Sequence, residues 1–344
     1  MEGLLVIDKP VGPTSHDVVA RLRRVLREQR IGHTGTLDPA ASGVLPIVIG
    51  RATRLARFLS GASKIYEAVV RLGFATTTGD AVGESLGPVF GGPFPERASI
   101  DSALDAFRGT FLQQPPAFSA KKIGGERSYA LARQRGRQLF STGAGAPPAA
   151  RTDADALGAA SHGRASAWPQ ALPAPVSVTT YTVDVVVVEN DLVTLRVECS
   201  AGFYVRSLAQ DLGAALGTGA HLAGLRRTKS GSLTIAAAVP LGEVERDPDL
   251  AARHGVPMAG MLTEYPSLVL SIEGVRHASQ GRTLRPADFA AESARSIQAG
   301  PTLGILDQSC HVRLLTPSGD LLGLADWQAI EGDPPVLHPS VVLG

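Results

Sequence analysis

The sequence predicts an α/β chain in which strand and helix patterns alternate, followed by a smaller, mostly β segment. Two observations predict this class. Short apolar runs bounded by glycine or proline are followed by apolar residues at helical spacing. Near the end, strand candidates at 303–307, 311–316 and 321–325 are separated by turn residues. A chain of 344 residues has room for about two domains. We expect the first over 1–264 and the second over 265–344.

The N-terminal part begins with an apolar run at 3–7 that predicts a buried strand. Proline and glycine residues end this run, and Thr14 or Ser15 can cap the helix that follows. Apolar residues recur at helical spacing between residues 18 and 26. Residues 31–46 form a loop rich in glycine and proline, a composition found where the backbone geometry is special.

Further along, residues 65–73 alternate like a strand, with Tyr66 on the apolar face. A short helix is expected at 99–109, and strands are expected at 181–188 and 192–199. A helix from about Val205 should end at Gly217, a residue that suits a C-terminal cap.

The segment 141–174 is dominated by Ala, Gly, Pro, Ser and Thr. Such a composition cannot bury enough apolar surface to fold by itself. We therefore expect a surface insertion without regular structure.

Composition excludes several classes of protein. Apolar residues make up 44% and charged residues 19% of the chain, which excludes wholesale disorder. Two cysteines cannot form a disulfide framework, and no His/Cys spacing suggests zinc. The N-terminus lacks the basic start of a signal peptide, and no apolar run approaches the roughly 20 residues of a membrane span. We expect a cytoplasmic protein without a membrane segment.

The net charge of +1 argues weakly against a nucleic-acid partner. It hides an asymmetry, because residues 1–140 carry +7 and residues 241–344 carry −6. A basic half can attract phosphates even when the whole chain is nearly neutral.

Generic catalytic motifs explain little here. The string GHTGTLDP at 32–39 is neither a dinucleotide fingerprint nor a phosphate loop, and no GxSxG elbow is present. By pattern alone, Asp38 before Pro39 is an ordinary turn or helix cap.

Four longer strings, at 3–19, 32–54, 113–136 and 199–233, change this interpretation. They include GLLVIDKPVGPTSHDVV, GHTGTLDPAASGVLPIVIGRATR and QQPPAFSAKKIGGERSYALARQRG. In this order they closely resemble the TruB family, the bacterial tRNA pseudouridine-55 synthases. The resemblance implies a catalytic domain with a mixed, mostly antiparallel sheet and flanking helices. The end of the chain resembles the family's small PUA-like domain more loosely.

The resemblance also implies the reaction. A uridine in the T loop of tRNA has its base detached, rotated and rejoined through carbon, without a cofactor or a metal. Asp38 matches the catalytic carboxylate, although the sequence leaves open whether it attacks the sugar or the base ring. Arg206 matches its partner arginine, which would lower the pKa of that carboxyl and hold its orientation.

Other residues match positions that hold the flipped base. Tyr66 would be the stacking platform, and its hydroxyl could help remove the ring proton. Tyr204 and Leu225 would line the pocket. His33 would occupy the space that the flipped nucleotide leaves, and Lys64 could contact phosphate.

The segment 113–137 resembles a loop that folds over the RNA, and its positive charge suits phosphate contacts. The basic side chains are Lys121, Lys122, Arg127, Arg133, Arg135 and Arg137. Two residues depart from the family pattern: Phe118 stands where a tyrosine is usual, and Phe203 replaces a small residue or threonine.

We therefore expect a monomeric tRNA pseudouridine synthase whose partner is the T arm of tRNA, with no obligate protein partner. Two alternatives remain: a tRNA-binding and tRNA-folding module that uses the same pocket, or a synthase that depends on a guide RNA and partner proteins. The RNA-covering loop favours direct recognition of tRNA.

Overall fold

The computed structural model describes residues 1–116, 122–123, 126–127, 174–298, 311–330 and 333–344. The expected insertion at 141–174 lies outside these residues except for its last position, as does the strand candidate at 303–307. The chain divides into two compact units, one formed by Met1–Ala62 with Ser230–Gly344 and the other by Ser63–Lys229. Each is described by itself, and the domain boundary at 264 stays a prediction.

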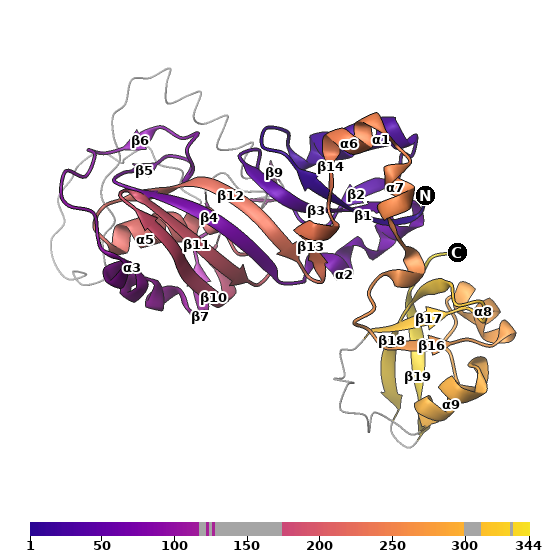
Figure 1. Cartoon of the computed structure of the whole chain (residues 1–344). Coiled ribbons are helices and arrows are strands. Elements are labelled where there is room, and N and C mark those ends of the chain that lie inside the picture. The colour runs from indigo at the N-terminus through magenta and orange to yellow at the C-terminus, as the bar shows by residue number, and fades with distance from the viewer. Residues whose placement is uncertain (117–121, 124–125, 128–173, 299–310, 331–332) are drawn as a thin grey trace. The chain divides into compact units, whose positions relative to one another are not determined.

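Unit 1 begins with the strand and helix that the sequence predicts (Figure 1). Thr14 caps α1 by accepting the backbone N–H of Asp17, and the Asp17 carboxylate accepts the backbone N–H of Thr14 in return. The elements of this part are β1 (Gly3–Lys9), α1 (Ser15–Leu26), β2 (Ile31–His33), β3 (Ala41–Ile49), η1 (Gly50–Leu55) and α2 (Ala56–Ser60).

The chain returns to unit 1 after residue 229. The elements there are β13 (Leu233–Thr234), η3 (Ile235–Ala237), β14 (Val239–Pro240), α6 (Leu241–Arg246), α7 (Leu250–His254), β15 (Val256–Pro257) and η4 (Met258–Gly260). Strand β1 pairs antiparallel with β3 and β15 and parallel with β14, while β2 pairs antiparallel with β3. The sheet of this unit is therefore mixed, as expected. Its two central strands, β1 and β3, are almost wholly buried.

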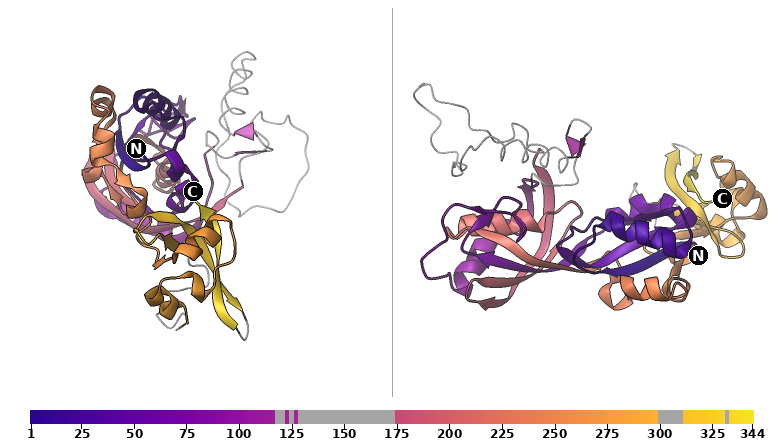
Figure 2. Two further views of the ribbon diagram at one scale, coloured as in Figure 1. Left: turned by 90° about the vertical axis from the view of Figure 1, so that its right-hand side faces the viewer. Right: turned by 90° about the horizontal axis from the view of Figure 1, so that it is seen from above.

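A separate four-stranded sheet forms the C-terminal part of unit 1, with α8 and α9 beside it (Figures 1 and 2). Its elements are β16 (Ser267–Val269), α8 (Ile272–Ser279), η5 (Pro286–Asp288), α9 (Ala291–Gln298), β17 (His311–Leu315), β18 (Leu321–Ile330) and β19 (Asp333–Val342). The predicted strands at 311–316 and 321–325 are confirmed as β17 and the start of β18.

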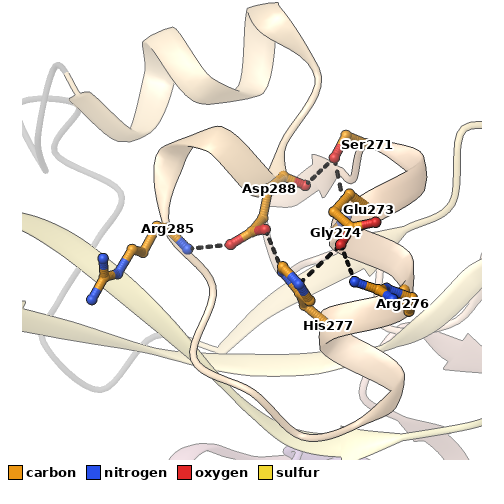
Figure 3. A network of polar contacts seen from close by, with 7 residues as sticks. All are labelled: Ser271, Glu273, Gly274, Arg276, His277, Arg285 and Asp288. Carbon is orange, nitrogen blue, oxygen red and sulfur yellow. Dashed lines mark hydrogen bonds and ion pairs between the residues drawn. The ribbon is translucent and has the colours of Figure 1, made fainter.

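A polar network ties α8 to η5 in this C-terminal part (Figure 3). The buried carboxylate of Asp288 accepts the backbone N–H of Arg285 at 2.8 Å and lies 2.7 Å from Nδ1 of His277. The hydroxyl of Ser271 caps α8 by accepting the N–H of Gly274. These bonds satisfy groups that would otherwise be orphaned at the ends of short helices.

The C-terminal sheet packs on the N-terminal strands through one apolar cluster. Its buried members come from both parts of unit 1: Leu4, Val48, Ala52, Leu55, Met261, Leu262, Leu321, Leu324 and Leu343. Arg51 and Arg54, on η1, donate to the carbonyls of Leu343 and Val342 at the end of the chain. The C-terminal part is thus fixed to the start of the chain.

Unit 2 is built on a sheet with strand order β12-β4-β11-β10-β7, in which the pairs from β4 to β7 are antiparallel. Its elements are β4 (Lys64–Leu72), β5 (Ala75–Thr76), β6 (Ser85–Leu86), α3 (Arg97–Leu104), η2 (Asp105–Phe107), β7 (Gly109–Gln113), β8 (Lys122–Ile123), β9 (Glu126–Arg127), β10 (Val176–Glu189), β11 (Leu192–Cys199), α5 (Val205–Ala215) and β12 (Ala220–Ser230). The strands predicted at 65–73, 181–188 and 192–199 and the helix from Val205 are confirmed. The helix predicted at 99–109 is shorter, because α3 ends at Leu104 and a 3-10 turn follows.

Candidate active site

The loop that carries Asp38 joins β2 to β3 and is anchored to the start of α1. The buried hydroxyl of Ser15 donates to the carbonyl of Leu37 at 3.0 Å and accepts the backbone N–H of Leu37 at 2.8 Å. Leu37 itself is 3% exposed. Because both backbone groups of the preceding residue are fixed in this way, the position of Asp38 is defined by buried contacts, while Asp38 itself is only half-buried.

Two backbone bonds complete this loop. The carbonyl of Asp38 accepts the N–H of Ala41, and the carbonyl of Pro39 accepts the N–H of Gly12. Gly12 has φ +114°, a conformation that glycine adopts readily. The loop 34–40 is therefore bonded at Leu37 to the first residue of α1 and at Pro39 to the turn that precedes this helix.

His33 ends β2, opposite Ile47 of β3. It is half-buried, and its ring lies edge-on to that of His16, with 5.8 Å between the ring centroids. The structure thus places His33 and Asp38 on one connection of unit 1. The remaining predicted site residues lie on unit 2.

Tyr66 and Lys64 lie on the same face of β4, as the alternation predicts. Both are buried, with 8% and 6% of their surfaces exposed, whereas Glu67 and Arg71 are exposed. Strand β4 pairs with β11 so that Lys64 stands opposite Cys199 and Tyr66 opposite Val197. The strand therefore presents the tyrosine to the interior face of the sheet.

Burial dominates the electrostatics around Lys64. Desolvation, together with the charge of Arg227, lowers the pKa of Lys64 to about 8. Desolvation raises the pKa of the neighbouring Cys199 thiol to about 12. Lys64 as a whole is 6% exposed, and its contact with phosphate stays a prediction.

Arg206 lies in the first turn of α5, and its side chain is 8% exposed. It donates to the carbonyl of Thr78 at 3.1 Å, and the same nitrogen lies 3.9 Å from a carboxylate oxygen of Asp80. One turn further along α5, Gln210 donates to the carbonyl of Thr76. The loop 76–80 therefore fixes the guanidinium from one side.

Asp80 is a neighbour of the candidate site residue Arg206 that the sequence does not single out. Its other carboxylate oxygen accepts the hydroxyl of Thr78 and the backbone N–H of Val82, so the turn holds it rigidly. A Thr-Gly-Asp turn is common, and spacing alone does not mark it as functional. Only the folded chain brings this turn to Arg206, 126 positions away in sequence by the difference of the two residue numbers.

Tyr204 precedes α5, and its backbone N–H and carbonyl both bond to the side chain of Gln113, at 2.8 and 3.0 Å. Phe203, beside it, is 9% exposed, and its ring lies edge-on to that of Phe111 on β7. Leu225 is half-buried on β12, next to β4.

Part of the predicted RNA-covering loop lies outside the described residues, including Phe118, Lys121 and the arginines at 133, 135 and 137. For Lys122 and Arg127 the structure describes the backbone alone, as a short antiparallel pair between β8 and β9. Among the described residues, no group of three His, Cys, Asp or Glu side chains is placed to hold a metal ion. No helix in the same part of the chain is long and apolar enough to cross a membrane.

Comparison with solved structures agrees with this fold. One chain from a Cbf5-Nop10-Gar1 complex superposes with a TM-score of 0.67, over 99% of this chain and 85% of that chain, at 23% identity. A chain from an H/ACA RNP bound to a substrate RNA containing 2′-deoxyuridine gives a TM-score of 0.65 at 22% identity, over 99% and 85% of the two chains. Likeness at this level of identity establishes the fold alone.

Two family models match the sequence. The model of the TruB family pseudouridylate synthase N-terminal domain matches residues 23–139, and the model of the tRNA pseudouridylate synthase B C-terminal domain matches residues 206–256. The first range contains Asp38 and Tyr66, and the second begins at Arg206. These matches define the class of the protein, the pseudouridylate synthases.

Curated relatives extend the match to the whole chain. A protein of Solibacter usitatus named tRNA pseudouridine synthase B is 37% identical over the full length of both chains. A protein of Gloeobacter violaceus with the same name is 45% identical over 71% of this chain and 73% of its own length. The chain belongs to the TruB family of pseudouridylate synthases.

Proposed function

We propose that this protein converts a uridine of tRNA to pseudouridine, and that the target is position 55 in the T loop. The observation that carries this proposal is the end-to-end similarity to a tRNA pseudouridine synthase B at 37% identity. A second observation supports the proposal. The loop with the string GHTGTLDP carries Asp38, and the buried hydrogen bonds between Ser15 and Leu37 fix its position. The T-loop position rests on the resemblance of segments 3–19, 32–54, 113–136 and 199–233 to the TruB family.

The reaction is an isomerisation and needs no oxidant or reductant. The bond between N1 of the base and C1′ of the sugar breaks, the base rotates, and a bond forms between C5 and C1′. C5 then loses its proton, and N1 gains one. A carboxylate can stabilise or attack the electron-deficient centre, so we assign this role to Asp38 and leave open which carbon it attacks.

We assign Arg206 as the arginine partner of that carboxylate and Tyr66 as the platform on which the flipped base stacks. Aromatic faces hold extruded bases, and a phenol hydroxyl can take part in removing the C5 proton. The burial of Tyr66 on the sheet supports a fixed platform, because a packed ring keeps its orientation.

The other predicted residues would recognise the RNA. Tyr204 and Leu225 would line the pocket, and His33 would fill the space that the extruded nucleotide leaves. Lys64 and the basic segment 113–137 would contact phosphate, with an affinity that falls as salt rises. We propose that the protein acts as a monomer in the cytoplasm, without a cofactor and without an obligate protein partner.

Tritium release tests the proposal. Purified protein alone is incubated with T-arm RNA or tRNA that carries [5-³H]uridine, because forming the C5–C1′ bond expels the C5 hydrogen. We expect release with the position-55 uridine present and none when that uridine is replaced by cytidine. Binding without release would favour the RNA-folding module, and release only after a guide RNA is added would favour the guide-dependent alternative.

A further inference from the structure

The side chain of Gln113 makes an unusual set of contacts for a residue at the end of a strand. It is 1% exposed, and its amide carries both a donor and an acceptor. The amide nitrogen donates to the carbonyl of Tyr204 at 3.0 Å, and the amide oxygen accepts the N–H of Tyr204 at 2.8 Å. The side chain thus pairs with the Tyr204 backbone as a neighbouring strand would.

Tyr204 is the residue from which α5 starts, and its own side chain does not cap the helix. Its carbonyl also accepts the N–H of Leu208, the first bond of the helix. Fixing both backbone groups of Tyr204 therefore fixes the direction in which α5 leaves the sheet. Arg206 is the second residue of that helix, so its Cα moves with this direction.

Two further contacts run alongside the amide pair. The ring of Phe203 packs edge-on against Phe111 of β7, and the hydroxyl of Ser207 donates to the carbonyl of Gln114 at 2.7 Å. The segment that begins with Phe203 is therefore joined to the end of β7 by apolar and polar contacts. Of these, only the Gln113 amide holds both the N–H and the carbonyl of one residue.

We propose that Gln113 is a positioning residue of the reaction: its amide fixes the backbone of Tyr204 and thereby sets the direction of α5 and the place of Arg206. The Thr78 and Asp80 contacts hold the guanidinium end of Arg206, and the Gln113 pair holds the backbone end. A displacement of about 1 Å in a catalytic arrangement is enough to lower a rate about a hundredfold. The proposal rests on the proposed function, because a rate is what Gln113 is inferred to affect.

Gln113→Met and Gln113→Glu test the proposal in the full-length protein. Methionine has a similar length but neither a donor nor an acceptor of comparable strength, so both bonds to Tyr204 are lost. We expect single-turnover tritium release to slow at least about thirtyfold, with tRNA affinity within threefold of the wild type. Thr110→Val is the matched control, since it removes an exposed hydrogen bond of the same strand to Thr179 and leaves Tyr204 untouched.

Gln113→Glu adds a readout that a purely structural role would not give. The ionised carboxylate cannot donate to the Tyr204 carbonyl, whereas the protonated acid can donate and accept as the amide does. Burial raises the pKa of a carboxyl. We therefore expect the rate deficit of Gln113→Glu relative to the wild type to shrink at least threefold from pH 8 to pH 6, while that of Gln113→Met stays constant.

Three results would overturn the proposal: wild-type rates in both variants, rate losses matched by equal losses of tRNA affinity, or a Gln113→Glu deficit that does not depend on pH. Failure of both variants to fold at 25 °C would also overturn it, because Gln113 would then be required only for folding. The wild-type protein measured alongside separates this proposal from the proposed function, since a wild type without tritium release contradicts the function itself.

Discussion

Single residues of the candidate site are held by groups close to them in space and far away in sequence. Arg206 and Asp80 form an ion pair in which the side chains are 8% and 15% exposed. Removing one partner of a largely buried pair leaves the other charge poorly compensated. The orientation of the guanidinium should therefore depend on this carboxylate as well as on the helix that carries the arginine.

Asp80→Asn tests that dependence. Asparagine keeps an oxygen that accepts the Thr78 hydroxyl and the Val82 N–H, so the turn should survive, while the negative charge beside Arg206 is lost. We expect single-turnover tritium release to fall by about 10- to 100-fold, which corresponds to about 1.4–2.8 kcal/mol, with little change in tRNA affinity by filter binding. Asp105→Asn, which removes an exposed pair with Arg108, is the control. Equal rates for both variants would contradict the role of Asp80.

Lys64 gives a pH-dependent prediction. Burial lowers its pKa to about 8 from an ordinary value of 10.5. Between pH 8 and pH 10.5 the unfolded chain binds more protons than the folded chain, so the free energy of unfolding rises with pH. Below pH 8 the buried charge therefore lowers the free energy of unfolding by its full amount. This penalty disappears as the pH rises towards 10.5. We expect Lys64→Met to raise the free energy of unfolding at pH 7 by an amount on the order of 2 kcal/mol.

The increase in the free energy of unfolding caused by Lys64→Met should become steadily smaller above pH 8. Urea unfolding of both proteins between pH 6 and pH 10 measures it. Arg71→Met, at an exposed position of the same strand, should show no such trend. If the free energies of unfolding of Lys64→Met and the wild type differed by the same amount at every pH, the lowered pKa of Lys64 would be contradicted.

At the scale of elements, the loop 34–40 depends on the start of α1. Ser15 bonds both backbone groups of Leu37, and all of these groups are buried. Ser15→Ala takes the hydroxyl partner away from the buried N–H and the buried carbonyl of Leu37. We expect a loss of about 2 kcal/mol in the free energy of unfolding and a fall in turnover larger than the fall in tRNA affinity.

Chemical denaturation and single-turnover kinetics measure these two effects. Ser279→Ala is the control, because its exposed hydroxyl donates to a carbonyl of its own helix. If Ser15→Ala kept wild-type turnover while losing stability, the position of Asp38 would not depend on the bonds between Ser15 and Leu37.

The elements themselves could be predicted well from the sequence, because their signals are local. The Thr14 cap, the alternation of β4 and the α5 helix starting at Val205 all follow from residues within one or two turns or along one strand. The end of α3 was missed, since a 3-10 turn at Asp105–Phe107 continues the helical spacing without continuing the helix.

The contacts of the site could not be predicted in the same way. Asp80 with Arg206, and Gln113 with Tyr204, join residues that lie on different elements of unit 2. No periodicity links them, so only the folded chain reveals the pairs. The catalytic candidates came instead from the resemblance of long strings to one family. The burial of Lys64 is another property of the site that local sequence patterns do not predict, because it depends on the pairing of β4 with β11.

At the scale of the whole molecule, the C-terminal sheet shares its core with the first strands of the chain. Leu324 is fully buried in the cluster that also contains Leu4 and Val48. We expect Leu324→Ala to cost about 2–5 kcal/mol of stability and to lower the unfolding transition of unit 1 as one event. Ile272→Ala, at a position 85% exposed, should leave the stability and the unfolding transition unchanged. Early unfolding of the C-terminal sheet alone, seen by hydrogen exchange, would contradict a shared core.

The division of charge also acts at this scale. The net +7 of residues 1–140 and the net −6 of residues 241–344 average to a chain that is nearly neutral, yet the family it belongs to acts on an RNA. Net charge alone therefore does not exclude a nucleic-acid partner, because attraction for phosphate depends on where the charges lie.

We propose that Asp38 is the residue on which the isomerisation of uridine in tRNA depends. The most direct test compares the wild type with Asp38→Asn in single-turnover tritium release from [5-³H]uridine-labelled tRNA, alongside tRNA affinity by filter binding. The substitution keeps the size of the side chain and removes its charge. We expect tritium release by the wild type, no measurable release by Asp38→Asn, and similar tRNA affinities for the two proteins. Normal turnover by purified Asp38→Asn protein would contradict this proposal.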